Sequence, residues 1–335
     1  MSIFLLMCLR NDQSRKQIKP TLIDAMDSPN PSAGKHKVAI ALCTYRRETM
    51  LRAALESIGK MRKPRNLAFL IVVDNDADQT AQTTVMRFAQ STDVEVVYQN
   101  EPKKGIAHAR QRAVDQACML GCSLLAFFDD DACVDPLWLV NLLAAYADYP
   151  CMAVTGEQKT ILPENCPVWI KQGSFFERKK PRDEGKILKG AATNNVLFNL
   201  EFAHLHGIRF DSRFNHIGGS DTDFFWRFYL KGGIIVWTNK AIVYENITEN
   251  RASFKWLFNR SLAYGARKIM HQRINSPKHP ILFTMAIILG FICRTFGLIA
   301  SLFFGKILFL RALIQWGRSL GQIKSLLGFY TKEYA

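Results

Sequence analysis

Several common signatures are missing from this sequence of 335 residues. It contains no Gly-x-Gly-x-x-Gly fingerprint and no Walker motif, which argues against a Rossmann dehydrogenase and a P-loop NTPase. Its eight cysteines are scattered and form no pair of CxxC motifs, so the sequence indicates neither a zinc site nor a disulfide framework. The apolar residues 1–9 have no basic region and no cleavage signature, which is not typical of a secretory signal. We therefore expect a cytosolic body in a reducing compartment.

Acidic residues are almost missing from the last quarter of the chain. From residue 251 to 335 there are thirteen Lys and Arg side chains and a single acid, Glu333, so this part carries +12 of the formal charge of +15. Such asymmetry indicates a polyanionic partner, either a membrane surface or a nucleic acid. Because the cations alternate with apolar residues, we favour the membrane and expect no nucleic acid.

The first half of the sequence alternates short apolar segments with helical patterns. Strands are expected at residues 38–43, 67–73, 94–98 and 123–128, and helices at about 50–59, 78–90 and 105–120. This alternation predicts βαβ units and therefore an α/β fold, with a mostly parallel sheet flanked by helices. In the second half we expect an irregular segment at 156–190, strands at 195–200, 234–237 and 241–244, and a helix at about 220–230.

The last quarter predicts helices that associate with a membrane. After a basic helix at about 252–272, residues 281–305 are apolar and long enough to span a bilayer, although Arg294 lies in the middle, where a charge is costly. Residues 307–327 are amphipathic and basic, which is typical of a helix in the membrane interface. The alternative is a helical subdomain that packs on the catalytic body or on a partner chain.

Three of the expected strands end in polar residues, namely Thr44-Tyr45-Arg46, Asp74-Asn75-Asp76 and Asp129-Asp130-Asp131. In a parallel sheet these ends lie along one edge, where α/β proteins bind ligands. Three adjacent carboxylates repel one another, and a Mg²⁺ or Mn²⁺ ion carrying phosphate oxygens would relieve that repulsion. Asp74 suits a base or a ribose, Tyr45 could cover a base, and Arg46 could reach a phosphate. Each residue alone could equally be a helix cap or a loop residue.

Basic residues also precede the helix expected at about 105–120. Lys103 and Lys104 stand before Gly105, and His108 and Arg110 follow it. A helix N-terminus with basic side chains stabilises phosphate, although His108 and Arg110 could equally be solvated.

Five segments, taken in order, resemble family 2 glycosyltransferases: Cys43–Arg47, Val72–Asp76, Gly105–Arg110, Asp129–Asp131 and Gly218–Phe225. The resemblance runs from about Val38 to Arg267 and is closest to the bacterial members that build exopolysaccharides such as succinoglycan. It implies the GT-A fold, inversion at the anomeric carbon, a nucleotide-sugar donor such as a UDP-sugar, and Mg²⁺ or Mn²⁺ as cofactor.

The resemblance also implies roles for individual residues. Asp221 would be the general base that deprotonates the acceptor hydroxyl. Asp131 would bind the metal ion, with Glu245 as a weaker ligand at a position where many members have His. Ser220, which replaces the usual Glu, and Asp223 would face the acceptor. The residues expected at the nucleotide sugar are Thr44, Tyr45, Arg46, Asp74, Asp76, Lys104, Gly105, Arg110, Asp129 and Asp130.

These expectations divide the chain into a flexible leader at residues 1–36, a catalytic domain at 37–250 and a basic membrane-associating region at 251–335. Within the catalytic domain, residues 37–135 would hold the nucleotide sugar and residues 136–250 the acceptor. The expected function is transfer of a hexose to a lipid-linked saccharide at the cytoplasmic face of the inner membrane, in surface polysaccharide synthesis. Basic residues near the membrane would suit the diphosphate of such an acceptor. The alternatives are a sugar nucleotidyltransferase and a non-catalytic basic protein that binds membranes or nucleic acid.

Overall fold

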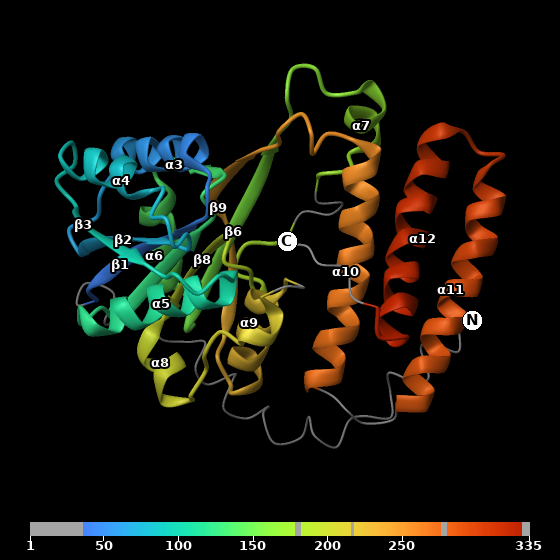
Figure 1. Ribbon diagram of the computed structural model, residues 1–335. Helices are drawn as coiled ribbons and strands as arrows, with labels where there is room; N and C mark the ends of the chain where they lie inside the picture. The colour runs from blue at the N-terminus through green and yellow to red at the C-terminus, as the bar shows by residue number, and fades with distance from the viewer. Residues whose placement is uncertain (1–35, 178–181, 216–217, 276–279, 330–335) are drawn as a thin grey trace.

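The computed structural model describes residues 36–177, 182–215, 218–275 and 280–329 (Figure 1). The expected leader, apart from residue 36, lies outside these ranges. Within them a nine-stranded sheet has the order β3-β2-β1-β4-β8-β6-β9-β5, and β7 pairs with β9.

Buried apolar strands build the first half of the sheet. β1 (Val38–Thr44), β2 (Leu67–Asp74), β3 (Glu95–Asn100) and β4 (Leu124–Phe128) are parallel to their neighbours in this half. Alternate residues of β1 enter two separate cores, because helices cover both faces of the sheet. α3 (Glu48–Lys60), α4 (Gln82–Ala89) and α6 (Trp138–Asp148) pack on one face. α5 (Ile106–Met119), α8 (Leu200–Leu205) and α9 (Ser220–Leu230) pack on the other.

The second half makes the sheet mixed. β8 (Asn195–Asn199) is antiparallel to both β4 and β6 (Ala153–Ile161), and β6 is parallel to β9 (Ile235–Asn246). The short strands β5 (Ala132–Val134) and β7 (Ile187–Leu188) pair antiparallel with β9. The predicted α/β fold with flanking helices is confirmed, and the reversed strands confine the parallel arrangement mainly to β1–β4.

Two local predictions in this half are wrong. Residues 156–161, expected to be irregular, belong to β6, and the helix α7 (Val168–Gly173) follows. The two strands expected at 234–237 and 241–244 form the single strand β9. Polar residues interrupt its apolar pattern where the pairing with β6 shifts, from Gly156 opposite Thr238 to Glu157 opposite Ile242. The irregularity lets one strand continue through a segment that looks like a turn in the sequence.

Three helices complete the chain, close to the places predicted: α10 (Phe254–Asn275), α11 (Pro280–Ser301) and α12 (Lys306–Leu326). α12 lies between α10 and α11 (Figure 1). Glycines let α10 and α12 approach closely, because a Cβ on Gly265 would lie 2.0 Å from the carbonyl oxygen of Arg318, and one on Gly321 would lie 2.1 Å from that of Leu262.

Helix α11 is the one helix among the described residues that is long and apolar enough, at Ile281–Ser301, to cross a membrane. Of the side chains in that stretch, only those of Ile287 and Ser301 are buried. The part of the chain that the structure describes therefore leaves most of the apolar surface of α11 uncovered.

Candidate active site

The polar ends of three strands meet at one edge of the sheet, as the sequence predicts. Thr44 at the end of β1 lies opposite Asp74 at the end of β2, and β4 runs parallel to β1 on its other side. The hydroxyl of Thr44 donates to Asp130 Oδ2 over 2.8 Å and so joins the first and third of these ends.

On the β1–β2 side, the carboxylate of Asp74 is fully buried. It accepts hydrogen bonds from Ala81 N (2.8 Å), the Tyr98 hydroxyl (3.0 Å) and Asp76 N (3.1 Å). Such bonds compensate for the removal of a carboxylate from water. The interactions fix Asp74 at the end of β2, so its oxygens have a defined position at the edge.

Asp76 is held by a different neighbour. Arg46 Nε donates to Asp76 Oδ2 over 2.8 Å, and this hydrogen bond is the main cause that lowers the pKa of Asp76. Tyr45 is 37% exposed and has two cations near its ring, with the Arg46 guanidinium 5.5 Å and the Lys104 ammonium 5.2 Å from the ring centre. The Tyr45 ring therefore presents an accessible aromatic surface next to positive charge.

The helix α5 starts beside this group. Gly105 has φ +141°, and a Cβ there would lie 2.3 Å from Asn215 Cγ, so the position requires glycine. Gly105 N donates to Asn75 Oδ1 and Ala107 N donates to Asn215 Oδ1, each over 2.8 Å. Two buried asparagines therefore hold the start of α5. Nothing in the sequence singles out Asn215, because its partner is 108 residues away.

The three consecutive aspartates are paired with arginines. Arg47 Nη1 lies 3.1 Å from Asp130 and 3.5 Å from Asp131. Desolvation raises the pKa of Asp130, while Arg47 and the Thr44 hydroxyl lower it. Arg251, which follows β9, lies 2.9 Å from Asp131. Sequence reasoning missed both arginines as site residues.

Arg251 also brings Glu245 into the site. Its Nη1 lies 3.5 Å from Glu245 Oε1, so the carboxylates of Asp131 and Glu245 share one cationic group. Desolvation raises the pKa of Glu245, Asp131 raises it further, and Arg260 and Arg251 oppose the shift. Among the described residues no three His, Cys, Asp or Glu side chains form a metal-binding group. Two carboxylate donors nevertheless fit Mg²⁺ or Mn²⁺, which are usually held by one or two carboxylates together with substrate phosphates.

Arg110 connects the aspartates with the start of α9. Its Nη1 donates to Ser220 Oγ over 2.9 Å, and its Nη2 lies 3.8 Å from Asp129. Desolvation by the surrounding protein raises the pKa of Asp129, although 42% of its side chain is exposed. Arg110 opposes this shift, whereas the negative charges of Asp131, Asp130 and Asp221 add to it. The carboxylate of Asp221 is therefore close enough to Asp129 for their charges to interact.

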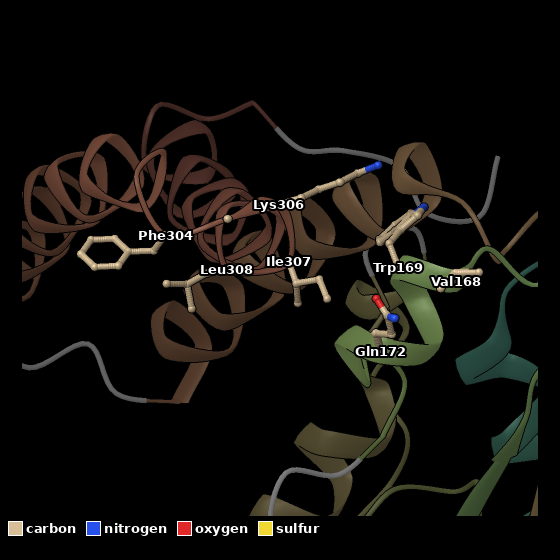
Figure 2. Close-up of a pocket in the computed structure, with 8 residues that line it drawn as sticks. Val168, Trp169, Gln172, Phe304, Lys306, Ile307 and Leu308 are labelled. Carbon is tan, nitrogen blue, oxygen red and sulfur yellow. The ribbon is translucent and has the colours of Figure 1, made fainter.

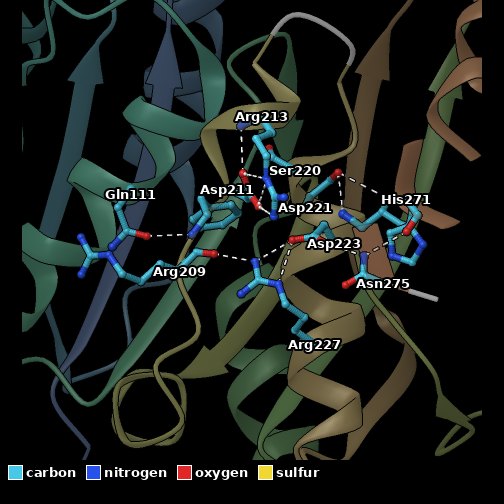
Figure 3. A network of polar contacts seen from close by, with 12 residues as sticks. Gln111, Arg209, Asp211, Arg213, Ser220, Asp221, Asp223, Arg227, His271 and Asn275 are labelled. Carbon is cyan, nitrogen blue, oxygen red and sulfur yellow. Dashed lines mark hydrogen bonds and ion pairs between the residues drawn. The ribbon is translucent and has the colours of Figure 1, made fainter. Parts of the chain in front are cut away.

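Asp223 lies between α9 and the end of α10, next to Arg227 and Asn275 (Figure 3). It is fully buried and accepts hydrogen bonds from Arg227 Nε (2.8 Å), Arg227 Nη2 (2.6 Å) and Asn275 Nδ2 (2.8 Å). The bond from Asn275 joins α9 to the end of α10. Of the residues expected at the acceptor, the structure thus places Ser220 at the edge and Asp223 in the contact between helices.

Comparison with known proteins agrees with this architecture. The sequence model of glycosyl transferase family 2 matches residues 39–204 of this chain. The chain is 33% identical over 229 residues to the succinoglycan biosynthesis protein ExoM of Rhizobium meliloti, covering 68% of this chain and 72% of that protein. It is 24% identical over 254 residues to the glucosyl-dolichyl phosphate glucuronosyltransferase of Haloferax volcanii, covering 69% and 76%.

Among solved structures, the mannosyltransferase PcManGT from Pyrobaculum calidifontis, in complex with GDP-Man and Mn²⁺, has a TM-score of 0.62 at 18% identity. The similarity covers 94% of this chain and 92% of that one, and it supports the GT-A fold. Together with the sequence match to ExoM, these likenesses show that the chain belongs to glycosyl transferase family 2 and is a glycosyltransferase.

Proposed function

We propose that this glycosyltransferase inverts the anomeric carbon of a UDP-sugar and transfers the sugar, a hexose, to a lipid-linked saccharide. This transfer would be a step in the synthesis of a surface polysaccharide and would take place at the cytoplasmic face of the inner membrane. The names of two relatives, a succinoglycan biosynthesis protein and a transferase that acts on a glucosyl-dolichyl phosphate, support this proposal. Family membership favours it over a nucleotidyltransferase and over a non-catalytic protein.

The donor would lie over the nucleotide-side half, residues 37–135. Asp74 and Thr44 would contact the base or ribose, and the exposed ring of Tyr45 would cover the base. The cations beside that ring, Arg46 and Lys104, would attract the diphosphate. The proposal also assigns donor contacts to Asp76, Gly105, Arg110, Asp129 and Asp130.

Asp131, with Glu245, would hold Mg²⁺ or Mn²⁺, and the ion when bound supplies positive charge for the leaving diphosphate. The chain's own residues carry the other tasks. The Asp221 carboxylate takes the proton of the acceptor hydroxyl. At the same time the oxygen of that hydroxyl bonds to the anomeric carbon, and the bond from this carbon to the diphosphate breaks. Arg110 holds the start of α9, and thus Asp221, against the aspartate segment.

This mechanism rests on one observation, the contacts of Arg110. Arg110 donates a hydrogen bond to Ser220, next to Asp221, and also contacts Asp129, which lies 92 residues before Asp221 in the sequence. Asp221→Asn should abolish transfer while UDP-glucose still binds, because the amide keeps the shape and cannot accept the proton. Asp93→Asn is the control, since Asp93 is 76% exposed and precedes β3 at the opposite edge of the sheet. Retained turnover in Asp221→Asn would contradict the assignment.

A second measurement tests the metal and donor assignments. UDP-glucose is titrated into the detergent-solubilised protein with and without Mn²⁺, by calorimetry. We expect binding that needs Mn²⁺ and that Asp131→Ala removes while Asp93→Ala retains it. Absence of binding for UDP-glucose and for every other nucleotide sugar tried would show that the aspartates are structural.

Membrane attachment is the third part of the proposal. The exposed residues Leu302, Phe303 and Phe304 continue the apolar surface of α11 into the turn before α12. A cavity of about 530 Å³ lies between this turn and α7, and its lining includes Trp169, Ile307 and the stem of Lys306 (Figure 2). Aromatic and apolar side chains next to a lysine suit the boundary between acyl chains and lipid headgroups.

Flotation with phosphatidylglycerol vesicles tests this attachment. Phe296→Asp on α11 should reduce the bound fraction severalfold, because a charge would then have to enter the apolar layer. Met119→Asp, at the end of α5 on the catalytic body, is a matched control because both side chains are 69% exposed. Equal flotation of the two variants would contradict attachment through α11.

A further inference from the structure

One face of α10 carries aromatic and cationic side chains in a line. Trp256, Arg260, Tyr264 and Arg267 follow one another at spacings of four, four and three residues, which places them on the same side of the helix. We call these four residues, together with Arg318 of α12, the arginine stripe. The guanidinium of Arg260 lies 4.8 Å from the Trp256 ring. Tyr264, 52% exposed, has Arg318 at 4.3 Å and Arg267 at 5.6 Å from its ring.

The stripe runs beside the candidate active site. At one end, Arg267 Cδ would lie 3.4 Å from a Cβ on Gly219, the residue before α9 and two before Asp221. At the other end, Arg251 lies over the Trp256 ring at 5.8 Å and pairs with Asp131. The cations thus extend along the α9–β9 side of the site, whereas Thr44 and Asp74 lie beyond β4 in the strand order.

The positive charge of the stripe is not balanced by acidic side chains within α10, α11 or α12. The sequence contains no Asp or Glu between residues 250 and 332, so α10, α11 and α12 cannot neutralise these arginines among themselves. In addition, the Nε of Arg318 is buried and makes no hydrogen bond within the described structure. A buried donor without a partner costs free energy, which an anionic ligand would recover.

We infer that the arginine stripe binds the phosphate or diphosphate group of an amphiphilic acceptor. This inference rests on the proposed function. Guanidinium groups bind phosphate oxygens with paired, charge-assisted hydrogen bonds, and three of them can hold a diphosphate from several sides. The place of the stripe next to α9 assigns it to the acceptor, because α9 carries the base that activates the acceptor hydroxyl. The neighbouring uncovered surface of α11 suits an acceptor that arrives from a lipid layer.

Binding of farnesyl diphosphate to the full-length protein in detergent tests the inference, with farnesol as the uncharged counterpart. We expect farnesyl diphosphate to bind at least tenfold more tightly than farnesol. Arg260→Gln, Arg267→Gln and Arg318→Gln should each weaken its binding about tenfold, in line with the loss of one charge-assisted contact. Arg318→Lys, which keeps the charge but not the paired geometry, should lose less. Lys255→Gln is the matched control, because it removes one exposed charge from a different side of α10, about 100–180° around the helix from Trp256, Arg260, Tyr264 and Arg267.

The same samples are titrated with UDP-glucose and with inorganic pyrophosphate. UDP-glucose affinity should stay within twofold in all variants, and pyrophosphate should bind more weakly than farnesyl diphosphate. Equal loss of UDP-glucose binding would assign the stripe to the donor, and equally tight pyrophosphate binding would make it a site for free phosphate; either result overturns the inference. Stripe variants that behave like Lys255→Gln would overturn it as well. If the wild type binds no nucleotide sugar at all, the proposed function fails, while the farnesyl diphosphate titrations still decide the role of the stripe.

Discussion

Arg251 allows a quantitative test of the charge balance in the site. Its Nη1 lies 2.9 Å from Asp131 and 3.5 Å from Glu245, and the side chains of Arg251, Asp131 and Glu245 are only 18%, 10% and 15% exposed. Arg251→Gln keeps a polar side chain and removes the charge, leaving two carboxylates close together without this cation. Hydrogen bonds to charged groups contribute about 1.5–3 kcal/mol, and breaking a fully buried ion pair costs about 3–5 kcal/mol.

Because all three side chains keep some contact with solvent, we expect a loss near the lower range, about 2 kcal/mol, in the absence of metal ions. For a chain of 335 residues that corresponds to a decrease of roughly 3 °C in Tm. Mn²⁺ should then stabilise Arg251→Gln more than it stabilises the wild type. In the variant, the ion can neutralise Asp131 and Glu245 directly, whereas in the wild type it competes with the guanidinium for the same oxygens.

Differential scanning fluorimetry measures both effects, first with EDTA and then over a range of Mn²⁺ concentrations. Arg52→Gln is the control, because Arg52 pairs with Glu48 on the exposed side of α3 and should change the stability by less than about 0.5 kcal/mol. Two results would refute the reasoning. If Arg251→Gln is as stable as the wild type in EDTA, the contacts of Arg251 contribute no net stability. If Mn²⁺ raises the Tm of both proteins equally, Arg251 and the ion do not share the carboxylates.

Three further predictions concern the helices around the site. Asn275→Ala should cost about 1–2 kcal/mol in urea denaturation by removing a donor from buried Asp223, and Asn275→Asp should cost more because it brings a second carboxylate there. Burial lowers the pKa of His271 below 6.5; Asp223 opposes this shift and Arg227 adds to it. The unfolded chain therefore binds the proton more readily than the folded chain, so the free energy of unfolding should fall as the pH decreases through 6.5. His271→Gln should reduce this pH dependence. Gly265→Ala should lower the Tm by forcing α10 away from α12, whereas Gly297→Ala on α11, where a Cβ meets nothing within 4 Å, should not.

The elements that could be predicted from the sequence are those whose signal is local. Continuous apolar runs identify β1, β2 and β4, and the polar residues that end them lie at one edge because parallel neighbours align their ends. No part of β6 was predicted as a strand. In its second part the signal is weak because Glu157, Gln158 and Lys159 are polar and only partly buried or exposed. Their strand character depends on pairing with β9, which lies about 85 residues further along the chain.

Side-chain partners across the sheet could not be predicted for the same reason. Arg47 contacts Asp130 at a separation of 83 residues, and Arg251 reaches Asp131 from the far end of β9. The placement of Asp223, in contrast, follows from helix geometry. Residues two positions apart on a helix point about 200° apart, so Asp221 and Asp223 face opposite sides of α9. Once α9 is known to begin at Ser220, Asp221 at the edge implies that Asp223 points toward the body of the protein.

The arrangement of charge explains why residues so far apart in the sequence belong to one site. Asp129 is balanced by Arg110 from α5, Asp130 by Arg47 before α3, and Asp131 by Arg251 after β9. Each aspartate thus depends on a different part of the chain for its counter-charge, and the segment can keep this position only when all three parts are folded together. Arg251 stands between this segment and α10, because it also lies over Trp256. The α9–β9 side of the site, which we propose binds the acceptor, therefore depends partly on α10. Changes in the packing of α10 should alter the position of the aspartates through Arg251.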